Sequence, residues 1–272
     1  MCEFCTQHGD GAVWYLNAQN YAADLLFDLE RRGYIIDFVR EFDSNVSTLL
    51  KGLRVVEAAP QRVAERAKRV VMERQKKSHW GQPVPIEDCE RIFDIATSIV
   101  QIPCVCRRFS GTPEKGYCLV ISVQPMDDIL MEAFPEYAEG PDSSGFQRLS
   151  KEDALALLRR TEAEGMMHSV WTFMTPFIAG LCNCNLESGC VAMRLAVEFE
   201  APNMWRGEKA AAIDWDLCTG CRECVSACPF GVIAYDHPNR RASVEEGDCW
   251  GCGTCRAACS EDAISLAARA MA

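Results

Sequence analysis

The sequence predicts an α+β protein with three regions along the chain. Residues 1–101 are expected to be mainly helical, residues 102–200 to form a mixed α/β domain rich in cysteine, and residues 201–272 to form a separate cysteine-rich domain. Apolar residues recur at helical spacing in the first region, a buried-strand pattern lies beside helix signals in the second, and a cysteine pattern is repeated in the third. The 272 residues, 49% of them hydrophobic, suffice to bury a core in one or two domains.

Four helices are expected in the first region. The apolar spacing from Tyr21 to Leu29 predicts the first helix, which Gly33 is expected to close. Pro60 suits the start of the third helix, and Cys89 is expected to be a core thiol in the fourth. The expected helices cover residues 21–33, residues 35–50, a segment that begins at residue 60, and residues 86–100.

The third of these helices is strongly basic, with only Glu65 and Glu73 as acidic residues. In a chain with a net charge of −11, such a strip could dock an acidic partner, or it could be an ordinary solvated face. Its basic residues are Arg62, Arg66, Lys68, Arg69, Arg74, Lys76 and Lys77.

The second region mixes strand and helix signals. The apolar run at 119–123 predicts a buried strand. Ser150 with Asp153 three residues later is typical of a helix start, and Gly165 is expected to end that helix. Another strand is expected at 191–199, and residues 201–210 are expected to link this region to the third.

The charge balance argues against two classes of partner. The 28 lysine and arginine residues against 39 aspartate and glutamate residues make the surface acidic, whereas nucleic acid and anionic membranes attract basic surfaces. No apolar run approaches the roughly 20 residues of a spanning helix, and Asp10, Asp24 and Asp28 interrupt any signal peptide. A soluble, cytoplasmic protein is therefore expected. There is no GxGxxG loop or P-loop, so nicotinamide, FAD and ATP sites have no sequence support.

The 17 cysteines are the unusual feature of the composition. An odd number cannot pair completely, and this chain has neither the small size nor the secretion signal of a disulfide-stabilised domain. Clustered thiols in a reducing compartment more often bind metal. The sequence therefore predicts metal centres.

The last eight cysteines form two copies of one pattern, 31 residues apart. Glycines recur with them, since Gly220 corresponds to Gly251. Small residues at these positions let backbone N–H groups approach a bound cluster. The first copy is Cys218, Cys221, Cys224 and Cys228, and the second is Cys249, Cys252, Cys255 and Cys259.

This duplicated pattern, over residues 210–266, resembles the bacterial two-cluster ferredoxin, in which the fourth cysteine of each copy ligates the other cluster. The resemblance implies a βαββαβ-type domain and two [4Fe–4S] clusters. Ser260 stands where a proline usually follows the last cysteine. Zinc is the alternative, although zinc sites usually use two cysteine pairs per ion. The implied ligand sets are Cys218, Cys221, Cys224 and Cys259 for one cluster, and Cys249, Cys252, Cys255 and Cys228 for the other.

Six further cysteines lie in two tight groups in the second region. A Cys-x-Cys segment places both thiols on one face of an extended chain, where they can reach one metal. We expect a third [4Fe–4S] cluster here; zinc, redox thiols and simple packing are the alternatives. The candidate ligands are Cys104, Cys106, Cys118, Cys182, Cys184 and Cys190.

This region also resembles an uncharacterised arrangement in iron–sulfur proteins of anaerobes. The shared outline is a Cys-x-Cys-Arg segment at 104–107, a Glu-Gly-hydrophobic-hydrophobic-His segment at 164–168 and a Cys-Asn-Cys segment at 182–184, followed by a ferredoxin repeat. The usual pattern continues with more cysteine, whereas Asn185 follows here, so the ligand set stays open.

Several other residues could serve a metal centre. Arg107 and Arg108 could raise the potential of an anionic cluster, and His168 could donate a proton or bind iron, but solvated arginines and a structural histidine are equally consistent. At the N-terminus, Cys2, Cys5 and His8 have the spacing of metal ligands, for zinc among others, or form a reduced, redox-active or packed pair.

The first functional hypothesis is an electron-transfer protein or subunit that passes electrons through two or three clusters to a partner oxidoreductase. That partner would carry the substrate chemistry on a flavin or on a molybdenum or tungsten cofactor, in a complex or oligomer. The second is an iron–sulfur enzyme with an open-site cluster at the middle cysteines, fed by the ferredoxin repeat. A redox sensor is a third class, but no nucleic-acid-binding module supports it.

Overall fold

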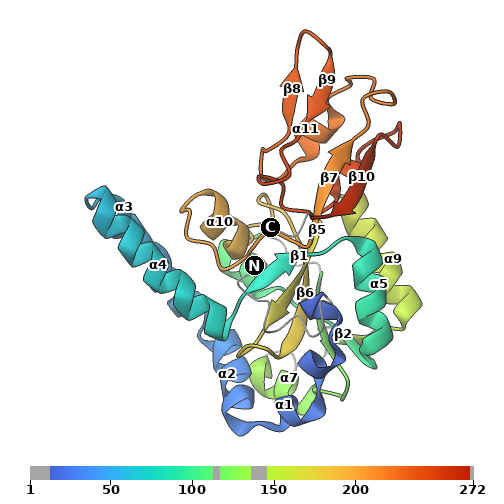
Figure 1. Ribbon diagram of the computed structural model, residues 1–272. Coiled ribbons are helices and arrows are strands. Elements are labelled where there is room, and N and C mark those ends of the chain that lie inside the picture. The colour runs from blue at the N-terminus through green and yellow to red at the C-terminus, as the bar shows by residue number, and fades with distance from the viewer. Residues whose placement is uncertain (1–12, 113–116, 136–145, 270–272) are drawn as a thin grey trace.

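The structure is a computed structural model that describes residues 13–112, 117–135 and 146–269. Cys2, Cys5 and His8 lie outside the described residues. Helices and strands are both well represented, as an α+β fold requires. A body built on one sheet carries a smaller domain, formed by the C-terminal part of the described chain from residue 209 onward, at one end (Figure 1).

The body is organised around a six-stranded antiparallel sheet with the order β1-β5-β6-β3-β2-β4. The central strands alternate buried side chains between two faces, as extended strands do. The strands are β1 (Gly81–Pro83), β2 (Ser98–Ile102), β3 (Cys118–Ser122), β4 (Gln147–Arg148), β5 (Met167–Thr172) and β6 (Ile178–Cys184).

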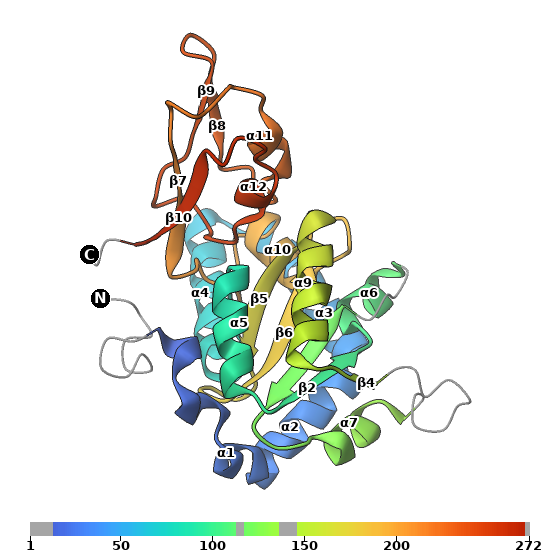
Figure 2. The same cartoon turned by 90° about the vertical axis from the view of Figure 1, so that its right-hand side faces the viewer.

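Helices cover both faces of this sheet. On one face lie α5 (Ile86–Ile95) and α9 (Lys151–Ala163), which appear to the left and right of β5 and β6 in Figure 2. On the other face, α2 (Leu29–Arg40) and α7 (Asp127–Ala133) pack against β2 and the start of β6. The shorter helices α6 (Val105–Ser110) and α10 (Val191–Val197) complete this second face near the C-terminal end of β6.

The first N-terminal elements lie against the body, and the next two helices project from it. The short turns η2 (Trp14–Leu16) and η3 (Ala18–Tyr21) and the helix α1 (Ala23–Phe27) lead into α2. The helices α3 (Phe42–Glu57) and α4 (Gln61–Ser78) form a hairpin that projects from the body (Figure 1). The basic helix expected from residue 60 onward is α4, and none of its residues is fully buried.

The C-terminal domain has the element order β-α-β-β-α-β that the repeat predicts. The first and last strands pair with each other, and the two middle strands form a hairpin. Its elements are β7 (Lys209–Ile213), α11 (Glu223–Ala227), β8 (Ala234–Asp236), β9 (Arg241–Ser243), α12 (Thr254–Ala257) and β10 (Ile264–Ala268).

Two expected helix ends in the first region are wrong. Gly33 does not close a helix, because α2 begins after the cap Asp28, which accepts a hydrogen bond from the Arg31 N–H at 2.7 Å, and continues through Gly33. The helix expected at 35–50 is two helices, since α2 ends at Arg40 and α3 begins at Phe42.

Two further expectations are corrected at the sheet. The helix expected at 86–100 ends at Ile95, because Ile99 and Val100 pair with β3 as part of β2. The strand expected at 191–199 is the helix α10. The boundary expected at residue 101 lies inside β2, so residues 1–101 and 102–200 contribute strands to one sheet.

The C-terminal domain is tied to α5 of the body by two ion pairs. Lys209 Nζ lies 3.2 Å from the buried Asp88 carboxylate, and Arg256 lies 2.7 Å from Glu87. The Gly207 N–H also donates to the Trp250 carbonyl. These contacts hold the smaller domain against one end of the sheet.

Candidate metal centres

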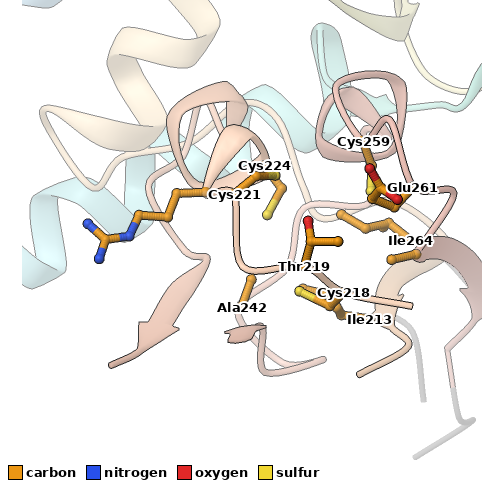
Figure 3. Close-up of a pocket in the computed structure, with 11 residues that line it drawn as sticks. Ile213, Cys218, Thr219, Cys221, Cys224, Ala242, Cys259, Glu261 and Ile264 are labelled. Atoms are coloured by element: carbon orange, nitrogen blue, oxygen red, sulfur yellow. The ribbon is translucent and has the colours of Figure 1, made fainter. Parts of the chain in front are cut away.

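Four cysteines of the C-terminal domain line one cavity, which we call the outer site (Figure 3). Two come from the loop that precedes α11, the third lies in the first turn of α11, and the fourth comes from the end of the other half of the repeat. Cys221 is exposed, Cys218 and Cys259 are half-buried, and Cys224 is buried. The lining cysteines are Cys218, Cys221, Cys224 and Cys259.

A second cavity, the inner site, is lined by Cys228, Cys249, Cys252 and Cys255. The last three are buried, and backbone groups already face one of them. The Ala211 and Gly251 N–H groups donate to the Cys249 Sγ at 3.3 and 3.4 Å. Such N–H···S bonds stabilise thiolates. The inner site is therefore the more enclosed of the two.

Glycine is required where these loops turn. Gly220 and Gly251 have φ of 73° and 76°, a region that side-chain-bearing residues rarely adopt. A Cβ at Gly220 would lie 2.2 Å from the Arg240 carbonyl oxygen, and one at Gly251 would lie 2.2 Å from that of Lys209. Each loop thus turns tightly against a neighbouring backbone segment.

The cysteines of the inner site can all be deprotonated at the same time only if a cation is bound beside them. Burial raises the pKa of Cys252 to about 11, although a hydrogen bond between its Sγ and the Thr254 hydroxyl acts in the opposite direction. Burial and repulsion from Cys252 and Cys249 raise the pKa of Cys255 well above its usual range. A bound metal removes this cost, because a coordinating thiol is deprotonated outright. Two groups of four converging cysteines, held by tight glycine turns, fit two [4Fe–4S] clusters in donor type and number.

Residues 217–264 match the family model of the 4Fe-4S dicluster domain. The C-terminal domain is therefore a ferredoxin-type iron–sulfur domain. The match supports a role in iron–sulfur electron transfer. No curated protein matches the chain. The family model covers none of the body, whose function depends on its own residues.

The structure brings the six middle cysteines together at one end of the sheet; we call them the six-cysteine site. Cys104 and Cys106 lie at the start of α6, Cys118 begins β3, Cys182 and Cys184 end β6, and Cys190 precedes α10. Cys104 hydrogen-bonds with Cys106 and Cys118, and Cys118 with Cys182. The Cys184 and Cys190 Sγ atoms lie 3.2 Å apart.

Hydrogen bonds among the six cysteines lower the pKa of some thiols and raise the pKa of others. Those from Cys106 and Cys118 hold the pKa of Cys104 well below its usual range, and one from Cys184 lowers that of Cys190. The same bonds, together with burial, raise the pKa values of Cys106, Cys118 and Cys184 well above their usual range. Cys104 and Cys190 are therefore the thiols of this site whose ionisation the hydrogen bonds favour, and four more sulfur donors lie beside them.

A buried arginine follows Cys106 in α6. Arg107 is only 4% exposed and stacks its guanidinium over the Tyr117 ring, 5.0 Å from the centroid. Within the described part of the chain no carboxylate pairs with it, and its Nε has no hydrogen-bond partner. Its Nη2 lies 3.7 Å from the Met166 sulfur. Arg108 instead donates to the Val39 carbonyl at 3.2 Å.

His168 lies away from the thiols. It pairs with Asn183 across β5 and β6, so its side chain is on the sheet face opposite Cys182 and Cys184. Its Nδ1 lies 2.7 Å from the Asn183 Oδ1, and burial lowers its pKa to about 4. This geometry agrees with a neutral structural imidazole.

Buried side chains connect the six-cysteine site to the inner site. Cys184 and Cys190 share one hydrophobic cluster with Cys252, and Phe230 and Trp250 pack against it. The Phe230 and Trp250 rings are stacked, with centroids 4.4 Å apart. Sequence reasoning missed these two aromatics, although Phe230 closely follows the first cysteine motif and Trp250 lies inside the second.

Two general searches complete the description. Every cysteine among the described residues is free, and in those residues no three His, Cys, Asp or Glu side chains are arranged around a single ion, even in the ferredoxin-type loops. No helix in the described part of the chain combines the length and apolar character needed to cross a bilayer.

Proposed function

We propose that this chain conducts single electrons between a redox partner and a third iron–sulfur centre in its body. The outer cluster would be held by Cys218, Cys221, Cys224 and Cys259, and the inner cluster by Cys228, Cys249, Cys252 and Cys255. When bound, each [4Fe–4S] cluster accepts or releases one electron at a potential set by its hydrogen bonds and exposure. The supporting observation is that each cavity is lined by one of these sets.

The six-cysteine site is the proposed third centre. Its six thiols exceed the four donors that one cubane needs, and four of the six are buried. Zinc would need only four of these thiols and would carry no electrons. We therefore favour iron and sulfide over zinc at this site.

One observation carries the proposal of a continuous path. Cys252 of the inner site packs in the same buried cluster as Cys184 and Cys190 of the six-cysteine site. Candidate ligands of the two centres thus belong to one continuous buried cluster, which offers an electron a route through the protein interior. The order along the path is then outer site, inner site and six-cysteine site.

The class of redox partner is proposed from the charge of the cluster-loaded protein. With two clusters bound, each cubane with its four thiolates carries a charge of about −2, so the holoprotein is more acidic than the sequence alone. Such a protein suits a partner with a basic docking face. An oxidoreductase with a flavin or a molybdenum or tungsten cofactor is the class of partner we propose.

The alternative is an enzyme with an open iron at the six-cysteine site. The oversupply of thiols and the burial of four of the six favour conduction over substrate binding. Cyanide distinguishes the two functions. A change in the third spectroscopic signal on adding cyanide would indicate an open iron, whereas an unchanged signal supports the electron path.

The proposal is tested by reductive titration of the anaerobic protein, followed by electron paramagnetic resonance. We expect three reducible centres, with magnetic coupling between neighbours. Cys104→Ser should alter the third signal and leave the two ferredoxin-type signals intact. Cys89→Ala is the matched control, since Cys89 is a fully buried core thiol outside all three sites. Only two reducible centres, both unaffected by Cys104→Ser, would contradict the third centre.

A further inference from the structure

The two ferredoxin-type sites differ in the solvent exposure of their cysteines. Cys249, Cys252 and Cys255 of the inner site are buried, and Met204 of the body lies in the same buried cluster as Cys252. In the outer site Cys221 is exposed. A redox partner can therefore approach the outer site more closely than the inner one.

Two large apolar side chains stand exposed beside the outer site. Trp215 is 45% exposed and Leu217 is 51% exposed, directly before Cys218 in the chain. Both ends of the Trp215 residue are fixed, because its Nε1 donates to the Ala242 carbonyl at 3.0 Å and its carbonyl accepts from Arg241 at 2.8 Å. An aromatic ring held rigidly in solvent is typical of an interface anchor.

Carboxylates surround these apolar residues. Asp214 and Asp216 flank Trp215, and the Asp214 N–H donates to the Ala263 carbonyl at 2.8 Å, which brings Glu261 and Asp262 alongside. All four carboxylates are exposed, and none takes part in an ion pair among the described residues. We call this surface the outer patch; it comprises Asp214, Trp215, Asp216, Leu217, Glu261 and Asp262.

Few cations neutralise the outer patch. The Arg222 guanidinium lies over the Tyr235 ring, 4.1 Å from its centroid, and Arg241 is held by the Trp215 carbonyl. The strongly basic helix α4 belongs to the hairpin that projects from the body, away from the ferredoxin-type domain (Figure 1). The outer patch therefore presents an apolar centre with a negative rim.

We propose that the outer patch is the docking surface for a redox protein whose own surface has an apolar contact ringed by lysine and arginine. This inference rests on the proposed function, and it assigns the outer cluster as the port through which electrons enter or leave. The apolar centre would supply contact area, and the carboxylates would steer the encounter and fix its orientation. An acidic partner is excluded by the same charges.

Electron transfer to a basic redox protein tests this assignment. Cytochrome c in its ferric form serves as the probe: one electron leaves the dithionite-reduced protein and converts ferric haem to ferrous haem. Stopped-flow absorbance gives the second-order rate constant. Asp216→Lys combined with Glu261→Lys should lower that rate constant at low ionic strength by about tenfold or more, and the difference should shrink as salt is added. Trp215→Ala should slow the reaction at every salt concentration.

A matched control separates the patch from net charge. Glu57→Lys combined with Glu65→Lys makes the same change in net charge at exposed positions on α3 and α4. This control should keep a rate constant close to that of the unaltered protein. Equal slowing by the control and the patch variant would overturn the proposal, as would a patch variant with full iron content and an unchanged rate constant.

Failure of the proposed function gives a different result. If the fully loaded, unaltered protein reduces neither cytochrome c nor the small acceptor ferricyanide, electron transfer itself is disproved. The affinity for oxidised cytochrome c, measured by calorimetry, then still tests whether the outer patch is the docking surface. Binding weakened by the patch variant and not by the α3–α4 control supports the outer patch, whereas equal binding by both contradicts it.

Discussion

At the scale of single residues, His168 makes stability depend on pH. It is fully buried, and burial lowers its pKa to about 4 from the usual 6.5. Because the unfolded chain binds this proton more readily, the stabilisation is complete above pH 6.5 and is lost as pH falls toward 4. Between pH 7 and pH 5, His168 should account for about 2 kcal/mol of lost unfolding free energy.

Denaturant unfolding of the cluster-loaded protein at pH 7 and pH 5 measures this loss. The control is His168→Gln, which keeps a hydrogen bond to Asn183 within reach and does not titrate. We expect the loss between the two pH values to be smaller in the variant. An identical loss in both proteins would show that His168 does not titrate as its burial requires.

The crossed ligand sets make a second prediction for single residues. Cys259 lies in the cavity of Cys218, Cys221 and Cys224, although it belongs to the other half of the repeat. Cys259→Ser should therefore change the same paramagnetic signal as Cys221→Ser, and Cys255→Ser should change the other. If Cys259→Ser and Cys255→Ser alter one common signal, each half of the repeat holds its own cluster.

At the scale of elements, the loop before α12 depends on Gly251. A Cβ there would lie 2.2 Å from the Lys209 carbonyl oxygen, so Gly251→Ala must displace either the loop or β7. We expect loss of the inner cluster, measured as a lower iron content with the outer signal retained. The control is Gly231→Ala, where φ is also positive, at 65°, but nothing lies within 4 Å of the added Cβ.

Gly231→Ala isolates the cost of the backbone conformation alone, which is about 1–2 kcal/mol. It should leave the iron content unchanged. Comparable iron loss in both variants would mean that strain, and not the close approach to Lys209, disrupts the inner site.

Some elements could be predicted from sequence because one physical signal dominated. The Ser150 cap and the apolar spacing after it predict α9, and the duplicated cysteine pattern predicts the order of elements in the ferredoxin-type domain. The helix α10 was not predictable in this way. Val191 and Leu195 pack toward α3, whereas Ala192 and Met193 pack toward the inner site, so a helix buried on two sides has the continuous apolar pattern of a buried strand.

At the scale of the whole molecule, long-range pairing forms the six-cysteine site. Cys118 and Cys182 are 64 positions apart in the sequence (182 − 118 = 64), and the antiparallel register of β3 and β6 brings them together. The sequence predicts that two groups of cysteines could share a metal, but it contains no signal for strand order. The side of the sheet that His168 occupies depends on the same register and could not be predicted either.

The attachment of the ferredoxin-type domain depends on Asp88 of α5. This buried carboxylate accepts a hydrogen bond from the Tyr15 hydroxyl at 2.8 Å and pairs with Lys209 at 3.2 Å. Asp88→Ala leaves the Tyr15 hydroxyl without its acceptor and removes one of the two ion pairs to the body. We expect a loss of about 3 kcal/mol in unfolding free energy, measured by denaturant unfolding.

The control for Asp88 is Glu90→Ala on the same helix. Glu90 is exposed and lies 3.9 Å from Lys151, so its loss should cost well under about 1 kcal/mol. Weakened attachment should also slow electron flow from the ferredoxin-type domain to the proposed third centre. Equal stability of the two variants would contradict the role assigned to Asp88.

The central claim is that the body holds a third iron–sulfur centre next to the inner site. Iron and acid-labile sulfide, counted per chain on anaerobically purified protein with zinc measured alongside, test it most directly. The account predicts about 12 iron and 12 sulfide, as three cubanes require. About 8 of each, with or without one zinc, would contradict it and confine the redox centres to the ferredoxin-type domain.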